Sequence, residues 1–358
     1  MKAVRLYGAK DIRIDEVEEP GAPEAGWIQV EVGWAGICGS DLHLYADGPM
    51  WPATPDVDRP QPVTGANLPF TLGHEFSGTV TALGDGVDGL AVGDRVAVMA
   101  GVWCGKCAAC KAGKTNLCEN RWGLGLSGLG GGLSAKVNMP AKVAVPVGDM
   151  ALEHAAMIEP LSVSTHGVRL AGVKEGDVVV IGGAGPIGVF AAAVAHAKGA
   201  RVIISEPNEA RRRTAVDTGV AFLGVDPMSE DLKAIVERET NGHMADVAID
   251  AAGVIPVINS LLDVVKVGGH LQLIAIPQKQ WEVNIANQLH HSEVTVTGTY
   301  GYVREDYEDS IALINSGKLD LDPYISAKIS TDEIVDKGFA TLMDRASTAV
   351  KILVDPRA

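Results

Sequence analysis

Four of the five cysteines of the chain stand close together in a C-x2-C-x2-C-x7-C pattern, as Cys104, Cys107, Cys110 and Cys118. Four thiolates at such spacing fill the tetrahedral shell of a zinc ion and leave no open position, which makes the predicted zinc structural. The ion would stabilise a glycine-rich stretch, residues 101–132, that has little apolar sequence of its own. Disulfides or an iron–sulfur cluster are the alternatives for the same residues.

A second pattern suits a phosphate-bearing cofactor. The G-x-G-x-x-G motif is Gly183-Ala184-Gly185-Pro186-Ile187-Gly188. It follows an apolar run expected to be a strand, and it opens a segment expected to be a helix, which is the context that a dinucleotide site requires. Glycines let the backbone approach a pyrophosphate, and the helix N-terminus offers unpaired N–H groups. A glycine turn required only for packing is the alternative.

The acid that follows the next predicted strand bears on cofactor choice. Glu206 stands about 20 residues beyond the glycines, where a carboxylate accepts hydrogen bonds from the adenosine ribose and repels a 2′-phosphate. This favours NAD over NADP. The neighbouring Arg211, Arg212 and Arg213 leave NADP as the alternative, because an arginine there would attract the phosphate.

The fifth cysteine, Cys38, and the histidine of Gly73-His74-Glu75 stand in glycine-flanked turns beside polar residues. A lone cysteine or histidine is usually structural. Here a cofactor for hydride transfer is already predicted, an alcohol must lose a proton before it gives up hydride, and zinc lowers the pKa of that hydroxyl. Cys38 and His74 are therefore candidates for a second, catalytic zinc.

The elements that position these residues fall into two kinds. The first part is predicted to be rich in short strands, at 27–32, 76–80 and 95–98, separated by a loop or flap at 48–69 that has six prolines. That loop is either functional or a plain surface excursion, and its Trp51 either lines a pocket or packs against neighbouring side chains.

The second part has a different pattern. From about residue 172, strands at 177–181, 201–205, 246–250 and 270–274 alternate with helices at 186–198 and 209–218. This alternation predicts a doubly wound parallel sheet, and a last strand at 350–354 is expected to return to the first domain.

Bulk properties limit the partners. A chain of 358 residues predicts two domains, and a net charge of −15 argues against nucleic acid and anionic membranes as partners. The N-terminus lacks the apolar core of a signal peptide, so we expect a cytoplasmic protein with reduced cysteines. The uncharged stretch 178–195 is long enough to span a bilayer, but its glycines and proline favour the nucleotide turn.

The motifs together resemble those of zinc-containing medium-chain alcohol dehydrogenases, in the branch of sorbitol dehydrogenase and (2R,3R)-2,3-butanediol dehydrogenase, over essentially the whole chain. The matching segments, besides the Rossmann glycines, are Cys38-Gly39-Ser40-Asp41-Leu42-His43, Gly73-His74-Glu75-Phe76-Ser77-Gly78, Val92-Gly93-Asp94-Arg95-Val96 and Glu159-Pro160-Leu161-Ser162. The proline-rich insertion and the ending Val350-Lys351-Ile352-Leu353-Val354 are closest to the butanediol enzymes.

The resemblance implies an α/β protein with a GroES-like β-rich catalytic domain at 1–157, a structural-zinc lobe at 101–120, a Rossmann domain at 158–298, and a return to the catalytic domain at 299–358. It implies that Cys38 and His74 bind the catalytic zinc, with Glu75 completing the shell directly or through water and Glu159 exchanging with it. Asp41 would orient His74, Ser40 would accept the proton of the substrate hydroxyl, and His43 would pass it to solvent. Gly183, Gly185, Pro186, Ile187, Gly188, Glu206 and Arg211 would contact the cofactor; Lys351 would either approach its pyrophosphate or lie at the surface.

The expected reaction is oxidation of a secondary alcohol or vicinal diol by NAD, or its reverse, with 2,3-butanediol and acetoin as the leading pair. Sorbitol or another polyol and threonine are alternatives, and a non-catalytic protein that binds zinc and nucleotide is the alternative of another class. Two zinc ions per chain and a small-molecule alcohol or ketone are the expected partners. Family members are homodimers or homotetramers, usually paired through the last strands of the Rossmann sheet.

Overall fold

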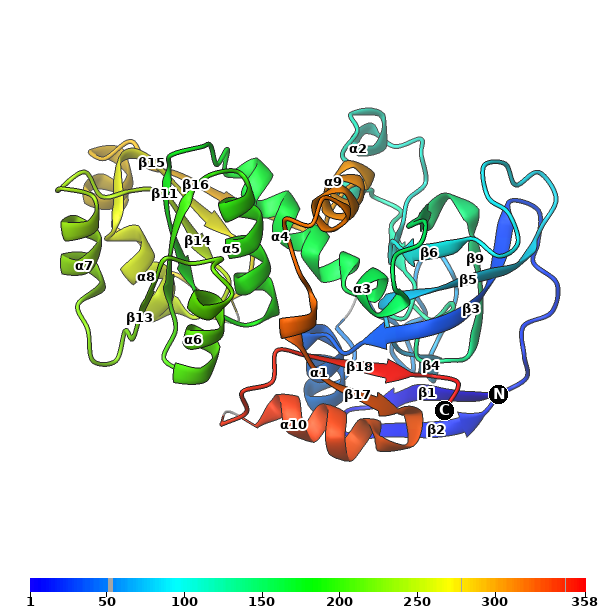
Figure 1. Ribbon diagram of the computed structural model, residues 1–358. Coiled ribbons are helices and arrows are strands. Elements are labelled where there is room, and N and C mark those ends of the chain that lie inside the picture. The colour runs from blue at the N-terminus through cyan, green and yellow to red at the C-terminus, as the bar shows by residue number, and fades with distance from the viewer. Residues whose placement is uncertain (51–53, 278, 345) are drawn as a thin grey trace. The chain divides into compact units, whose positions relative to one another are not determined.

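The computed structural model describes residues 1–50, 54–277, 279–344 and 346–358. The chain divides into two units (Figure 1). The first comprises Met1–Glu159, Val303–Ile311 and Tyr324–Ala358, and the second comprises Pro160–Tyr302 and Ala312–Pro323. By this division Val303–Ile311 and Tyr324–Ala358 belong to the first unit, whereas Ala312–Pro323 belongs to the second, so the division differs within 299–358 from the expected domain bounds. Trp51 lies outside the described residues.

The first unit is built on a seven-stranded sheet with the order β10-β6-β5-β3-β18-β17, and β9 also pairs with β3. Its strands are β3 (Trp27–Gly36), β5 (Glu75–Leu83), β6 (Arg95–Val98), β9 (Lys136–Pro140), β10 (Ala144–Pro146), β17 (Ile325–Ser330) and β18 (Lys351–Asp355). The last strand thus lies in the sheet of the first unit, next to β3, as expected. The long strand β3 pairs with β5 on one side and β18 on the other, so it joins segments far apart in sequence.

Smaller elements complete this unit. The three-stranded sheet β2-β1-β4 contains β1 (Lys2–Gly8), β2 (Asp11–Glu16) and β4 (Phe70–Thr71), and β7 (Gly101–Val102) pairs with β8 (Trp122–Gly123). The α-helices are α1 (Gly39–Asp47), α2 (Ala108–Lys111), α3 (Leu152–Ala156) and α10 (Ala340–Met343). Short 3-10 turns are η1 (Thr115–Leu117), η2 (Ala141–Val143) and η5 (Thr331–Glu333), and η6 (Ile334–Phe339) is a π-helix. The described part of the proline-rich segment 48–69 forms turns and one isolated bridge, as predicted.

The second unit is a six-stranded parallel sheet with the order β13-β12-β11-β14-β15-β16. Its strands are β11 (Val178–Gly182), β12 (Arg201–Ser205), β13 (Leu223–Val225), β14 (Ala245–Asp250), β15 (Val265–Leu273) and β16 (Thr295–Gly298). Its helices are α5 (Pro186–Ala197), α6 (Glu209–Asp217), α7 (Leu232–Glu239), α8 (Ile255–Leu262) and the π-helix η3 (Ile285–His290). Helices α4 (Ile158–Leu170) and α9 (Arg304–Asn315) and the turn η4 (Asp322–Tyr324) cross the unit boundaries. Renumbered along the chain, the strand order is 3-2-1-4-5-6, the doubly wound order of dinucleotide-binding sheets.

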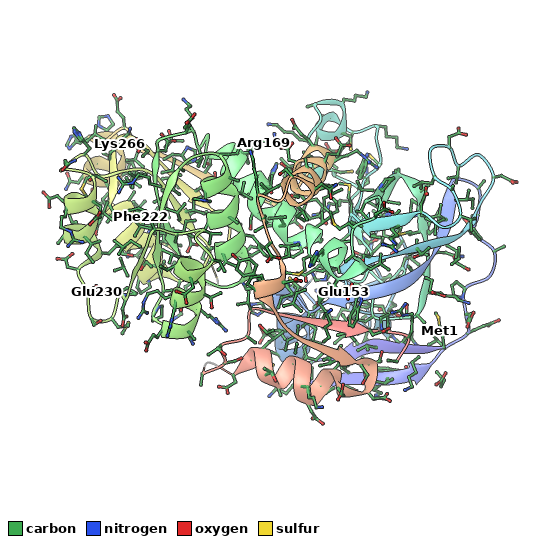
Figure 2. All side chains as sticks on the ribbon, viewed as in Figure 1. Met1, Glu153, Arg169, Phe222, Glu230 and Lys266 are labelled. Atoms are coloured by element: carbon green, nitrogen blue, oxygen red, sulfur yellow. The ribbon has the colours of Figure 1, made fainter. Side chains whose placement is uncertain are left out.

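The sequence explains this sheet. All five residues of β11 are buried, as a run of valine and isoleucine requires when helices cover both faces. Charged side chains, Glu230 among them, surround the core on the outside (Figure 2). The uncharged segment 178–195 is thus β11 and part of α5, and no helix among the described residues is long and apolar enough to cross a membrane.

Candidate functional site

The pairing of β3 with β5 brings the two halves of the candidate catalytic zinc site together. Gly36, the last residue of β3, is opposite Glu75, the first residue of β5. Cys38 follows the first strand and His74 precedes the second, so both lie at the same end of the sheet. One ligand atom each from Cys38, His74 and Glu75 lie within 4.8 Å of one another. A thiolate, an imidazole and a carboxylate form a donor set that zinc accepts.

Helix α1 fixes the cysteine and the histidine relative to each other. Cys38 is the residue that precedes the helix, and its backbone N–H donates to Asp41 Oδ2 at 3.0 Å. The other carboxylate oxygen, Oδ1, lies 3.4 Å from His74 Nδ1. Asp41 is fully buried. One carboxylate thus contacts both candidate ligands, an arrangement that orients metal-binding histidines in many zinc sites.

The same helix presents the two candidate proton-transfer groups. Ser40 Oγ lies 3.0 Å from His74 Nε2, the ring nitrogen opposite the one that faces Asp41. His43, one turn further along, is 49% exposed, and its Nδ1 lies 3.4 Å from Asp47 Oδ2. A hydroxyl inside the site and an exposed imidazole three residues away are suited to moving a proton from the site to solvent.

The electrostatics of the site favour a cation. Burial opposes a positive charge on His74, but the Asp41 carboxylate and the Cys38 sulfur outweigh burial and raise the pKa of the ring well above its usual value. The negative groups that would hold a proton there would equally attract a divalent cation. The site therefore fits zinc in both donor chemistry and charge.

A buried ammonium group lies behind the cluster. Lys351 is 2% exposed, and its Nζ is 2.6 and 2.8 Å from the two carboxylate oxygens of Glu75. Lys351 is therefore not at the surface, which corrects one of the two expectations for it. Its approach to the pyrophosphate of the cofactor remains a prediction. Burial disfavours its charge, but Glu75 and Cys38 outweigh burial and raise the pKa of Lys351.

Glu159 occupies a separate position. It is 8% exposed and lies at the start of α4. It is not one of the three residues whose ligand atoms lie within 4.8 Å of one another, although its charge contributes to the raised pKa of Lys351. The exchange of Glu159 with Glu75 on the metal remains a prediction.

The four-cysteine lobe has the dimensions of a closed zinc site. Sulfur atoms of Cys104, Cys107, Cys110 and Cys118 lie within 4.8 Å of one another, and Cys107 Sγ is 3.9 Å from Cys118 Sγ. Four sulfurs about 2.3 Å from a zinc ion would be about 3.8 Å apart. All five cysteines of the chain are free, so no disulfide joins the four sulfurs of the lobe in this structure.

Backbone N–H groups prepare this lobe for thiolates. Those of Lys106 and Cys107 lower the pKa of the Cys104 thiol to about 6, and those of Cys110 and Glu119 lower the pKa of Cys107. Burial raises the pKa of Cys110 to about 12. Donors directed at sulfur stabilise the thiolate, the form that binds metal. The positive charge of a bound metal ion would stabilise the thiolate form of Cys110.

The glycine turn of the second unit has the geometry that its motif predicts. Gly183 has a φ of +101°, which only glycine adopts without strain. A Cβ on Gly188 would lie 1.9 Å from the Gly183 carbonyl oxygen, whereas a Cβ on Gly185 would meet nothing within 4 Å. Pro186 and Ile187 open α5 directly afterwards. The turn therefore packs against itself on one side and stays open beside Gly185, where backbone N–H groups at the helix start can receive phosphate.

Glu206 lies against this turn. Its Oε2 accepts from the Ala184 N–H at 2.7 Å and its Oε1 accepts from the Asn208 N–H at 2.8 Å. Both oxygens retain lone pairs for further donors such as ribose hydroxyls. The neighbouring arginines differ: Arg212 donates to the Glu206 carbonyl, Arg213 pairs with Asp217, and Arg211 is half-buried on α6.

Comparisons with known proteins agree with this geometry. Family models described as "Alcohol dehydrogenase GroES-like domain" and "Zinc-binding dehydrogenase" match residues 24–149 and 186–316. The (R,R)-butanediol dehydrogenase of Neisseria gonorrhoeae is 39% identical over 99% of both chains. The chain belongs to the zinc-containing medium-chain alcohol dehydrogenase family. A 2-dehydro-3-deoxy-L-galactonate 5-dehydrogenase of Pseudoalteromonas atlantica is 38% identical over 100% of this chain and 99% of its own. The crystal structure of 2R,3R-butanediol dehydrogenase from Bacillus subtilis matches with a TM-score of 0.91 and 36% identity over 99% of both chains.

This dehydrogenase is therefore an oxidoreductase of the zinc alcohol dehydrogenase type that acts on alcohols or diols, and its fold class is confirmed. The pairing of Lys351 with Glu75 was not predicted from the sequence. The signal available was a lysine directly before the apolar run Ile352–Val354 of a strand, where a buried charged side chain must find a partner.

Proposed function

We propose that the chain is an NAD-linked, zinc-dependent dehydrogenase that interconverts 2,3-butanediol and acetoin. The observation that carries the proposal is the cluster of Cys38, His74 and Glu75, with Ser40 Oγ at 3.0 Å from His74 Nε2. Zinc held there would stabilise negative charge on the substrate oxygen and so lower its pKa. The close relatives named as butanediol dehydrogenases support the diol as substrate.

The chain's own residues perform the remaining steps. Ser40 accepts the hydroxyl proton of the alcohol, and His43 passes it to water, since its side chain is half-exposed. NAD bound at the turn Gly183–Gly188 would accept the carbinol hydrogen with its electron pair, and the alcohol carbon would become the carbonyl of acetoin. Asp41 keeps the His74 ring oriented throughout.

Binding of NAD involves the second unit. We assign the pyrophosphate to the turn Gly183–Gly188 and the adenosine ribose to Glu206. NAD is proposed over NADP because a buried carboxylate beside the turn repels a 2′-phosphate. Arg211 is the residue that would favour NADP. Two zinc ions per chain are proposed, one in each cluster.

A substrate panel tests this proposal. Turnover with NAD and with NADP would be compared for the butanediol stereoisomers, sorbitol, xylitol, threonine and 2-propanol. We expect the highest kcat/KM with a butanediol and NAD, by about tenfold or more over the simple alcohol, because a site that pairs with both hydroxyls loses those bonds when one is absent. An equal response to all substrates would contradict the assignment.

A sugar acid or other polyol is the second candidate, since a relative at 38% identity is named 2-dehydro-3-deoxy-L-galactonate 5-dehydrogenase. Preference for a hexonate or sorbitol over butanediol in the same panel would favour it.

We also propose that two copies associate through the edge strand β16. Among the described residues this strand is the last of its sheet and pairs with β15 alone. An unpaired strand edge invites pairing with a second copy. The second unit also carries the exposed apolar side chains Val267, Ile276 and Ile285. Sedimentation of the purified chain should show a dimer or tetramer, and a monomer at all concentrations would contradict this.

A further inference from the structure

Asp250 is a buried carboxylate at the carboxyl end of β14, and the proposed mechanism does not use it. Its side chain is 0% exposed. Its Oδ1 accepts hydrogen bonds from the backbone N–H groups of Ala252 and Gly253, both at 3.1 Å, and its Oδ2 accepts from the Gly253 N–H at 3.2 Å. The carboxylate thus holds the turn that follows the strand, and these donors are all neutral groups.

No positive side chain compensates this carboxylate within the part of the chain that the structure describes. Asp246, near the start of the same strand, differs, because its Oδ1 pairs with the Lys266 ammonium. Burial raises the pKa of Asp250, whereas the N–H groups of Ala252 and Gly253 act in the opposite direction. Those hydrogen bonds favour the charged form, so Asp250 places an uncompensated negative charge inside the second unit.

The turn that Asp250 holds lies against the glycine turn of the nucleotide site. Gly182, the residue before the glycine turn, is opposite Asp250 in the pairing of β11 with β14. The Ala251 N–H donates to the Gly182 carbonyl at 3.0 Å, and a Cβ on Gly183 would lie 3.3 Å from the Ala252 Cβ. The carboxylate is therefore buried beside the backbone that we assign to the cofactor.

The strand order indicates which half of a dinucleotide would lie on the side of Asp250. The order β13-β12-β11-β14-β15-β16 reverses between β11 and β14, and dinucleotides bind across the sheet edge at such a point. Glu206, assigned to the adenosine ribose, follows β12, and the turn assigned to the pyrophosphate follows β11. The other half of the cofactor, which carries the nicotinamide, would then lie on the side of β14 and β15.

The nicotinamide ring is the part of the cofactor whose charge depends on its redox state. The ring is positively charged in NAD⁺ and neutral in NADH, whereas the pyrophosphate is the same in both. A buried negative charge without a partner attracts the cationic ring and has no comparable effect on the neutral one. Its repulsion of the pyrophosphate is common to both forms and cancels when their affinities are compared.

We propose that Asp250 is a specificity-determining residue that favours the oxidised cofactor, because its buried negative charge stabilises bound NAD⁺ relative to bound NADH. The inference rests on the proposed function, since it takes a nicotinamide dinucleotide to bind at the turn Gly183–Gly188. It adds a discrimination between two redox forms to the choice between NAD and NADP that we assign to Glu206.

The test compares the dissociation constants of NAD⁺ and NADH for the native chain and for Asp250→Asn. Asparagine retains Oδ1, the oxygen that accepts from both Ala252 and Gly253, and removes the charge. Binding of NADH is followed by its fluorescence, and binding of NAD⁺ by displacement of NADH, both without substrate. We expect the ratio Kd(NAD⁺)/Kd(NADH) to rise about fivefold, the scale of one charge–charge interaction at the effective dielectric of a protein.

Asp246→Asn is the matched control. Asp246 lies toward the other end of β14 and pairs with Lys266, so this variant removes the same charge farther from the sheet edge that carries the glycine turn. We expect its ratio of dissociation constants to stay within about twofold of the native ratio.

A purely structural role for Asp250 predicts a different pattern. If Asp250→Asn weakened NAD⁺ and NADH equally, or weakened NADH more, the proposal would be overturned, whatever the loss in absolute affinity. Asp250→Ser is the second variant without the charge and serves where the asparagine variant does not fold, since a serine hydroxyl also accepts from the backbone N–H two residues on. It must raise the same ratio.

Failure of the proposed function would look different. If the native chain bound neither NAD⁺ nor NADH, the cofactor assignment would be wrong, and this inference with it. If the native chain bound both and the ratio did not change in Asp250→Asn, only the inference would be wrong.

Discussion

Replacing Cys38 by serine is expected to remove one zinc ion per chain and to lower turnover about 10³-fold or more. The variant loses the thiolate of the cluster formed by Cys38, His74 and Glu75. Cys38 follows β3, whereas the other two ligands lie at the start of β5, which pairs with β3. A metal that stabilises charge on a substrate oxygen supplies several kcal/mol, and each 1.36 kcal/mol is tenfold in rate, which gives about 10³.

The measurement combines zinc content with the initial rate of NAD reduction. The thermal unfolding midpoint serves as the control, because Cys38 is not part of the four-cysteine lobe and the fold should persist. Full turnover with two zinc ions per chain in Cys38→Ser would contradict the catalytic site.

A cysteine-to-serine substitution in the four-cysteine lobe should lower the stability of the protein, in contrast to Cys38→Ser. Cys110→Ser is expected to lose the structural zinc and to lower the unfolding midpoint of the first unit by about 10 °C, since each kcal/mol corresponds to about 2–4 °C in a domain of this size. Between Trp103 and Trp122 the buried residues are Asn116 and Cys118, so the lobe has almost no apolar core of its own. Metal binding must supply what packing does not.

Calorimetry and zinc analysis of Cys110→Ser check this, with Cys38→Ser as the matched cysteine-to-serine control. An unchanged midpoint together with two retained zinc ions would rule out a structural zinc bound by these four residues. Iron and sulfide in the native protein would favour the iron–sulfur alternative.

The parts of the molecule that the sequence predicted are those set by local spacing. The glycine turn and the strand β11 before it depend on residues next to one another, and the lobe depends on four cysteines within one short segment. Hydrophobic periodicity, the spacing of cysteines and the residues of a turn involve only a few neighbouring positions. These features can therefore be predicted from the sequence without knowledge of the fold.

The catalytic cluster and its supporting lysine depend on strand pairing instead. His74 lies 36 positions after Cys38 in the chain. The two residues come together only because β3 pairs with β5, with Gly36 opposite Glu75. Lys351 lies near the C-terminus and reaches the cluster because β18 pairs with β3. Register between distant strands follows from tertiary packing, which is why the resemblance to a family was needed for Cys38 and His74 and why the pairing of Lys351 was not predicted.

The most direct test of the central claim is the rate of NAD reduction by (2R,3R)-2,3-butanediol as the catalytic zinc is removed with a chelator and then restored. We expect activity to fall with the loss of one zinc ion per chain and to return when that ion is replaced. Activity that persists after the zinc bound by Cys38 and His74 has gone, or no reduction of NAD by any diol with both zinc ions in place, would contradict it.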